Sequence, residues 1–455
     1  MPLSLRISSV TRRRVLFFFL ILLLAASVRI LTFNFLRAHL DDPSWFQSGS
    51  YRVFDKRAND ILDGTGRLYW IDDPSRTDQA QYPPAYPWLV AAVYRISGNR
   101  SAYSVQTVQA VLDSILALVL ITGLAVTAYG WPTAMAASFF AALSPLLAIV
   151  GVAPSSDAPT TWLVIAGLWL LLIAAKRGSI VWALASGIVL GAACWLRVNP
   201  LYLCFFWALP LFLFAHAPRR RRALMGGAVV LGTLLMISPI VIRNYVVFPD
   251  FTPTGGTIGA NLWEGLGETE LGRNNGFAFG DDVMVERERV KMGVPAGAPF
   301  EAMWPDGIKR DRQRTSESLS FIKQHPVWYA GVMLRRMWGM LKVAGDPVPH
   351  TGISGINVTS SKCLPENWQH GVLAFSVNLL GMIQSVVRYL FLPLAAFGIY
   401  AGIRHDWRMS CLMLVTILYY LVPGTAAHTE IRYVLPMHGL LIVFASMGIA
   451  RLIKR

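Results

Sequence analysis

Residues 12–33 read RRRVLFFFLILLLAASVRILTF, three arginines followed by an almost wholly apolar run. A run of about 20 apolar residues is long enough to cross the hydrocarbon core of a membrane as a helix. The apolar part exceeds the core of a typical signal peptide, and Arg29 and Asn34 stand where a cleavage site would need small residues. We therefore expect Val15–Phe33 to be an uncleaved first membrane helix.

The composition extends this expectation to the whole chain. Of its 455 residues, 54% are hydrophobic and only 15% are charged, whereas soluble domains carry about 25% charged residues. This excludes a disordered chain, a coiled coil and an ordinary cytosolic enzyme. We predict an all-α polytopic membrane protein with roughly ten transmembrane helices. After the first, the expected spans are Val105–Tyr129, Thr133–Val152, Thr160–Ala175, Ile180–Trp195, Leu201–Ala215, Ala223–Ile242, Tyr389–Ile403, Met409–Val422 and Val434–Ile449.

The basic residues, which give the chain a net charge of +15, fall in alternate loops between these spans. One set of loops holds Arg12–Arg14 and Arg219–Arg222, and the short loops of the other set hold few basic residues. The positive-inside rule then predicts that the N- and C-termini are cytoplasmic. Because the charges flank spans and do not gather on one polar domain, we expect contact with membrane lipids and no nucleic-acid partner.

With this orientation, two long segments of a single membrane domain, residues 1–455, face outward. The first outer loop comprises residues 34–87 and is expected to contain amphipathic helices. The second comprises residues 243–388, punctuated by Gly and Pro. Within it, basic residues alternate with Leu, Met and Trp over Trp328–Val343, a pattern typical of a helix in the membrane interface.

Ionisable residues at the outer ends of spans are candidates for function, because charges at membrane depth are costly. Carboxylates beside arginines suit a ligand that has an apolar tail and a phosphate, and a carboxylate can activate a hydroxyl or hold a divalent cation. Purely structural roles are open too: Arg197 and Arg243 could reach lipid headgroups, Asp157 could cap a helix, and Asp113 could be a buried ion-pair partner. The candidates are Asp42, Asp55, Asp157, Arg197, Arg243, Glu430 and Arg432.

Several stretches, in order along the chain, carry a family resemblance. They are residues 54–64 (FDKRANDILDG), 82–89 (YPPAYPWL), 187–200 (GIVLGAACWLRVNP), 239–245 (PIVIRNY), 261–263 (NLW) and 430–436 (EIRYVLP). Together they resemble the polyprenyl-phosphate-sugar-dependent glycosyltransferases of the GT-C superfamily, of the bacterial membrane type. The nearest named relatives are protein O-mannosyltransferase-like and aminoarabinose-transferase-like enzymes.

The resemblance implies an enzyme that moves a sugar, with inversion, from a polyprenyl-phosphate donor to a lipid, glycan or protein acceptor. The active site would lie at the outer face of a bacterial inner or plasma membrane. An Asp early in the first outer loop would be the general base, and arginines would hold the donor phosphate. The substrate-binding residues that the resemblance implies are Tyr82, Asp157, Arg197, Arg243, Glu430 and Arg432.

The chain departs from the family pattern at Ser50, where relatives carry the catalytic Asp. Asp55 or Asp42 is then expected to act as the base. Aminoarabinose-type relatives carry an acidic residue and a Lys at the positions of Gln81 and Tyr82. The cofactor is therefore undetermined, and a divalent cation is one candidate. Two other functions are open: a transporter or flippase for a lipid-linked saccharide, and a non-catalytic relative that binds lipid-linked sugar.

Overall fold

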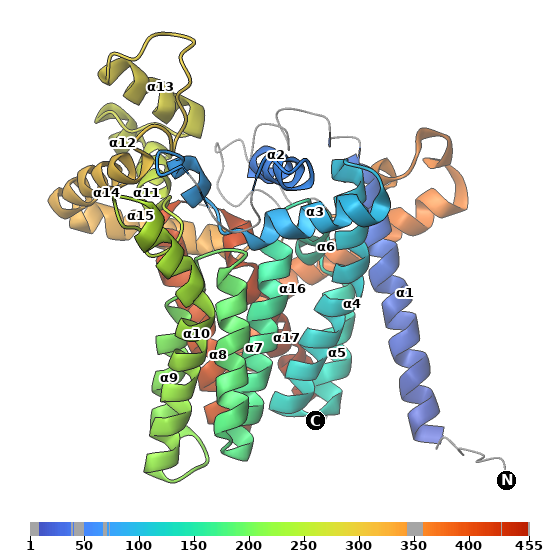
Figure 1. The fold of residues 1–455 in the computed structure, drawn as a ribbon. Helices are drawn as coiled ribbons and strands as arrows, with labels where there is room; N and C mark the ends of the chain where they lie inside the picture. Colours follow the sequence, from blue (N-terminus) through green and yellow to red (C-terminus); the bar gives the residue numbers. More distant parts are fainter. Residues whose placement is uncertain are drawn as a thin grey trace.

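The computed structural model describes residues 9–37, 40, 50–66, 71, 73–343, 358–428 and 430–453. Over these residues the regular structure is helical, which confirms the predicted class. A bundle of long helices is covered at one end by short ones (Figure 1). The bundle helices are α1 (Ser9–Arg37), α4 (Ala102–Tyr129), α5 (Trp131–Leu143), α6 (Pro145–Val152), α7 (Asp157–Arg177), α8 (Ile180–Cys194), α9 (Leu203–Phe214), α10 (Arg219–Val247), α16 (Gly371–Ala427) and α17 (Leu435–Ile453).

Most of the short helices come from the two segments predicted to face outward, but α3 extends beyond the first segment and η5 lies outside both. We call the end of the bundle that they cover the upper face, following Figure 1, where α1 begins and α17 ends at the opposite, lower end. The short helices are α2 (Ser50–Leu62), η2 (Thr77–Ala80), α3 (Ala85–Ser97), α11 (Ile258–Gly267), α12 (Glu270–Asn274), α13 (Asp281–Lys291), α14 (Gly307–Gln324), α15 (Pro326–Met340), η3 (Ser361–Cys363), η4 (Glu366–Trp368) and η5 (Ile431–Val434).

The predicted number of spans is confirmed only in part. Among the described residues, six helices are long and apolar enough to cross a membrane, or seven if the bent pair α5–α6 is one span. The predicted spans at α8 and α9 are helices of only 15 and 12 residues, and at about 1.5 Å per residue these are shorter than the roughly 30 Å of a hydrocarbon core. Two further predicted spans lie within the single 57-residue helix α16.

Helix α16 crosses the bundle twice, because its helical backbone is interrupted at Asp406 (φ −151°, ψ 91°). Near this break the Ser410 hydroxyl lies 2.7 Å from the Tyr129 hydroxyl at the end of α4. Earlier in α16, the Gln384 side chain donates to the carbonyl of Leu143 at the other end of the bundle, at 2.9 Å. The second pass therefore returns the chain to the upper face, where α17 is preceded by η5.

A buried ion pair holds α1 against the bundle. Arg29 Nε lies 3.1 Å from Asp113 Oδ2, and the indole of Trp162 donates to Asp113 Oδ1 at 2.8 Å. Both charged side chains are almost fully buried, so this pairing and hydrogen bonding offset their desolvation. The structure thus gives Asp113 the role of a buried partner.

Small residues let α8 and α10 approach closely, as is common between membrane helices. A Cβ added at Gly187 would lie 2.1 Å from the Val229 carbonyl oxygen, and one at Gly232 would lie 2.6 Å from that of Leu184. Thr233 also donates its hydroxyl to the Gly187 carbonyl at 3.0 Å. This contact fixes the middle of α8, whose upper end leads to Arg197.

Candidate active site

A polar cavity of about 210 Å³ lies under the short helices of the upper face. Stretches that are far apart in the sequence line it: α2, the residues before α3, α7, α14 and α17, the residues after α8, and the region of α11 and α13. Its ionisable and amide-bearing lining residues are Gln81, Tyr82, Arg197, Asn261, Glu264, Asp281, His428, Glu430, Arg432 and Tyr433.

Tyr82 belongs to the first-loop wall of this cavity. Its ring lies edge-on to Phe54 of α2, with 5.0 Å between the ring centroids. Its carbonyl accepts a hydrogen bond from Arg57 at 3.2 Å. Burial, with a further contribution from the Asp281 carboxylate, raises the pKa of the Tyr82 hydroxyl, which therefore stays protonated and able to donate.

Arg197 reaches the cavity from the residues that follow α8. It forms an ion pair with Asp157, the first residue of α7. Its guanidinium carbon lies 4.4 Å from the ring centroid of Tyr433. The capping role considered for Asp157 is wrong, since Ser156 occupies the N-cap. Asp157 Oδ2 is buried and has no hydrogen-bond partner among the described residues, so the carboxylate serves chiefly to fix Arg197.

Glu430 and Arg432 line the cavity from the segment between α16 and α17. Arg432 Nε lies 3.0 Å from Glu430 Oε2, and Arg432 Nη2 donates to Glu430 Oε1 at 3.2 Å. The two predicted arginines, Arg197 and Arg432, therefore share one small cavity, each with a carboxylate at its side.

The carboxylates of Glu264 and Asp281 were missed by the sequence reasoning. Glu264 lies on α11 and Asp281 is the first residue of α13. Burial, reinforced by the neighbouring charge of Asp281, raises the pKa of Glu264 to about 7. Burial likewise raises the pKa of Asp281. The cavity thus contains a carboxyl group that can hold or release a proton near neutral pH.

His428 was also missed, and it connects the cavity to a buried ion pair behind it. Its Nδ1 lies 2.9 Å from Glu268 Oε1, and its Nε2 lies 3.8 Å from Glu430 Oε1. Glu268 in turn pairs with Arg336 of α15 at 3.0 Å. Burial lowers the pKa of His428, but the hydrogen bond to Glu268 and the field of Glu430 outweigh it, so the pKa is raised.

Arg336 ties this network to the backbone of three elements. It donates to the carbonyls of Thr425 at 3.0 Å and Ala427 at 3.2 Å and also to that of Gly265. A Cβ at Gly265 would lie 1.6 Å from the Ala427 carbonyl oxygen, so the close approach of α11 to the end of α16 requires a glycine there. This packing places Glu268 beside His428.

Other predicted site residues lie away from the cavity lining or outside the described residues. Asp55, on α2, accepts a hydrogen bond from the Tyr94 hydroxyl at 2.5 Å. Arg243 is 4% exposed and donates to the Asn244 side chain at 3.0 and 2.7 Å, so it does not extend to lipid headgroups. Asp42 lies outside the described residues.

The described residues contain no group of three or more His, Cys, Asp and Glu side chains arranged to hold a metal ion. The cavity carboxylates of Glu264 and Asp281 can each accept a hydrogen bond from a bound hydroxyl or exchange a proton with it.

One family model matches part of the chain. Residues 81–242, which carry Tyr82, Asp157 and Arg197, match the family model of dolichyl-phosphate-mannose-protein mannosyltransferases. Over these residues the chain is similar to that glycosyltransferase family. The match covers about a third of the chain and leaves out the segments of Glu264 and Arg432. No protein of curated function matches the chain.

Solved structures show what the fold resembles. Three crystal structures of the Archaeoglobus fulgidus oligosaccharyltransferase resemble it: one tethered with an acceptor peptide containing the NVT sequon, one in the apo form and one in complex with Zn and sulfate. The TM-scores are 0.51, 0.50 and 0.51 at 13%, 14% and 12% identity. The matches cover 95% of this chain but only about half of the archaeal one, so they show the GT-C-like fold alone.

Proposed function

We propose that this protein transfers a sugar, with inversion, from a polyprenyl-phosphate donor to an acceptor at the outer face of the membrane. The observation that carries the proposal is the convergence of Arg197 and Arg432 on one buried cavity that also holds carboxylates. The match of residues 81–242 to the mannosyltransferase family model supports the class of donor. In this proposal the upper face is the outer one, and both termini are cytoplasmic, as the distribution of basic residues predicts.

In the proposed reaction, Arg197 and Arg432 bind the donor phosphate. An acceptor hydroxyl attacks the anomeric carbon from the side opposite the phosphate, and the carbon–oxygen bond to the phosphate breaks with its electron pair on that oxygen. Charge on the phosphate grows during this step, so two guanidinium groups held by Asp157 and Glu430 would stabilise the transition state more than the ground state.

The proton of the acceptor hydroxyl must pass to a base. We propose that a carboxylate accepts it, and three are candidates: Asp42 and Asp55, on the strength of the family resemblance, and Glu264, because it lines the cavity with a pKa near neutral. The hydrogen bond that Asp55 accepts from Tyr94 draws it toward α3, which weighs against it. Removal of the true base is expected to lower the rate about 10²–10⁴-fold.

The test is transfer of radiolabelled sugar from a polyprenyl-phosphate donor in membranes that contain the full chain. We expect label to move from lipid into an acceptor fraction with release of polyprenyl phosphate, and Arg432→Gln to reduce this at least tenfold. Arg100→Gln, which changes an arginine exposed at the surface and paired with Asp63, is the matched control. Label that crosses the membrane but stays on its lipid would instead indicate a flippase. Label that is bound by the protein but is never transferred would indicate a non-catalytic relative.

A further inference from the structure

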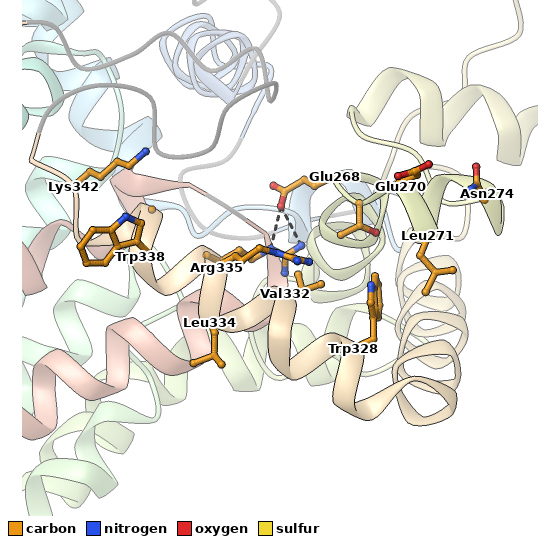
Figure 2. Close-up of a pocket in the computed structure, with 13 residues that line it drawn as sticks. Glu268, Glu270, Leu271, Asn274, Trp328, Val332, Leu334, Arg335, Trp338 and Lys342 are labelled. Atoms are coloured by element: carbon orange, nitrogen blue, oxygen red, sulfur yellow. Dashed lines mark hydrogen bonds and ion pairs between the residues drawn. The ribbon is translucent and has the colours of Figure 1, made fainter.

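A groove of about 990 Å³ lies between α12 and α15 (Figure 2). It is separate from the polar cavity. Apolar side chains form most of its walls: Leu271 on the α12 side, and Trp328, Val332, Leu334 and Trp338 on the α15 side. The buried ion pair of Glu268, drawn with dashed lines in Figure 2, contributes to the lining.

Helix α15 carries large apolar side chains that the protein leaves uncovered. Trp338 is 64% exposed and Leu334 is 66% exposed. The helix PVWYAGVMLRRMWGM contains two arginines and no acidic residue. Exposed Trp and Leu beside basic residues are typical of a helix that lies in the interface of a membrane and not in water.

The charges at the groove suit an anionic group. Arg335 lies on α15 and Lys342 follows two residues after the end of that helix, and both line the groove together with Trp338 (Figure 2). Among the described residues, Arg335 forms no hydrogen bond or ion pair. Its neighbour Arg336, in contrast, is engaged by Glu268 and three backbone carbonyls. Glu270, on the α12 wall, is the exposed acidic side chain of the lining.

We propose that this groove binds one anionic phospholipid of the surrounding membrane. Arg335 and Lys342 would hold its headgroup phosphate, and an acyl chain would lie along Trp328 and Leu271. The donor lipid is the less suitable occupant, because the proposed function already assigns its phosphate to the arginines of the polar cavity. The buried Glu268–Arg336 pair stands between that cavity and the groove. The proposal concerns binding, and it holds or fails independently of sugar transfer.

The experiment compares lipids retained by the full chain in nanodiscs of phosphatidylcholine doped with phosphatidylglycerol, counted by native mass spectrometry after transfer to detergent. We expect one phosphatidylglycerol to be retained by the wild type. Arg335→Gln/Lys342→Gln should weaken this retention roughly thirtyfold, the loss that follows from removing two cations near an anionic headgroup. Lys309→Gln/Lys323→Gln, two exposed lysines of α14, is the matched control and should behave as wild type.

Two further variants make the result of the experiment decisive. Trp338→Ala alters the apolar wall at an exposed position, so it should lower the retention of both phospholipids without unfolding the protein. Arg335→Gln alone serves if the double variant does not fold. Equal retention by wild type and Arg335→Gln, or preferential retention of phosphatidylcholine, phosphatidylethanolamine or added polyprenyl phosphate, would overturn the proposal.

Discussion

Replacement of Glu268 by Gln tests whether the buried network behind the polar cavity stabilises the fold. The Glu268 and Arg336 side chains are only 5% and 4% exposed, and His428 is 7% exposed. The glutamine would keep the shape and one acceptor oxygen but would remove the only negative charge in direct contact with the Arg336 guanidinium among the described residues. Loss of one partner of a buried ion pair costs about 3–5 kcal/mol, and we expect about 3 kcal/mol here because hydrogen bonding is partly kept.

The same substitution should change the pH dependence of stability. The pKa of His428 is raised in the folded protein, so its contribution is fully present below the unfolded pKa of about 6.5 and is lost as pH rises through the folded pKa. Without the Glu268 charge, the folded pKa of His428 should fall. We therefore expect the fall in stability of the wild type between pH 6 and pH 9 to be smaller in Glu268→Gln.

Thermal unfolding in detergent, followed by intrinsic fluorescence from pH 5 to pH 9, measures both effects. At pH 6 we expect Tm to fall on the order of 5 °C. The control is Glu270→Gln, which removes an exposed carboxylate two residues away and should leave Tm within about 1 °C. An unchanged Tm for Glu268→Gln, or an unchanged pH profile, would refute the reasoning.

Two further predictions concern packing and a buried carboxyl group. Gly187→Ala should greatly reduce the yield of folded protein in size-exclusion chromatography, because its Cβ would lie 2.1 Å from the Val229 carbonyl oxygen. Gly227→Ala, which meets nothing within 4 Å, should not. Glu264→Gln should raise the stability at pH 8–9 by up to about 3 kcal/mol and leave it unchanged near pH 4, because the wild-type carboxyl group must ionise in a buried site above its pKa of about 7. Equal Tm values for this variant and the wild type at pH 9 would contradict the burial argument.

Most of the helical architecture could be predicted because membrane spans depend on local composition. Long apolar runs such as that of α4 need no knowledge of tertiary contacts. The prediction was less accurate at α8 and α9, where the structure shortens the helices. At α16, in contrast, the break at Asp406 lies between the two predicted spans Tyr389–Ile403 and Met409–Val422. Apolarity marks where a chain can be buried, but it does not tell a full span from a short helix that packs against its neighbours.

The residues of the candidate site could likewise be predicted only in part. Tyr82, Arg197, Glu430 and Arg432 stand in stretches with a recognisable sequence pattern, and the structure brings all four to one cavity. The resemblance gave no reason to expect that Arg243 would instead hold the Asn244 side chain, which donates to the carbonyls of Thr252 and Thr254 at 3.0 Å.

Glu264, Glu268 and His428 could not be found in this way because their roles depend on contacts between segments about 160 residues apart. The one local signal was Gly265, between the two glutamates, since glycine permits the approach of the Ala427 carbonyl. That approach sets His428 against Glu268, and Glu268 against Arg336 of α15. Because His428 lines the polar cavity and Arg336 lines the groove, we expect a displacement of α15 to shift His428 through Glu268.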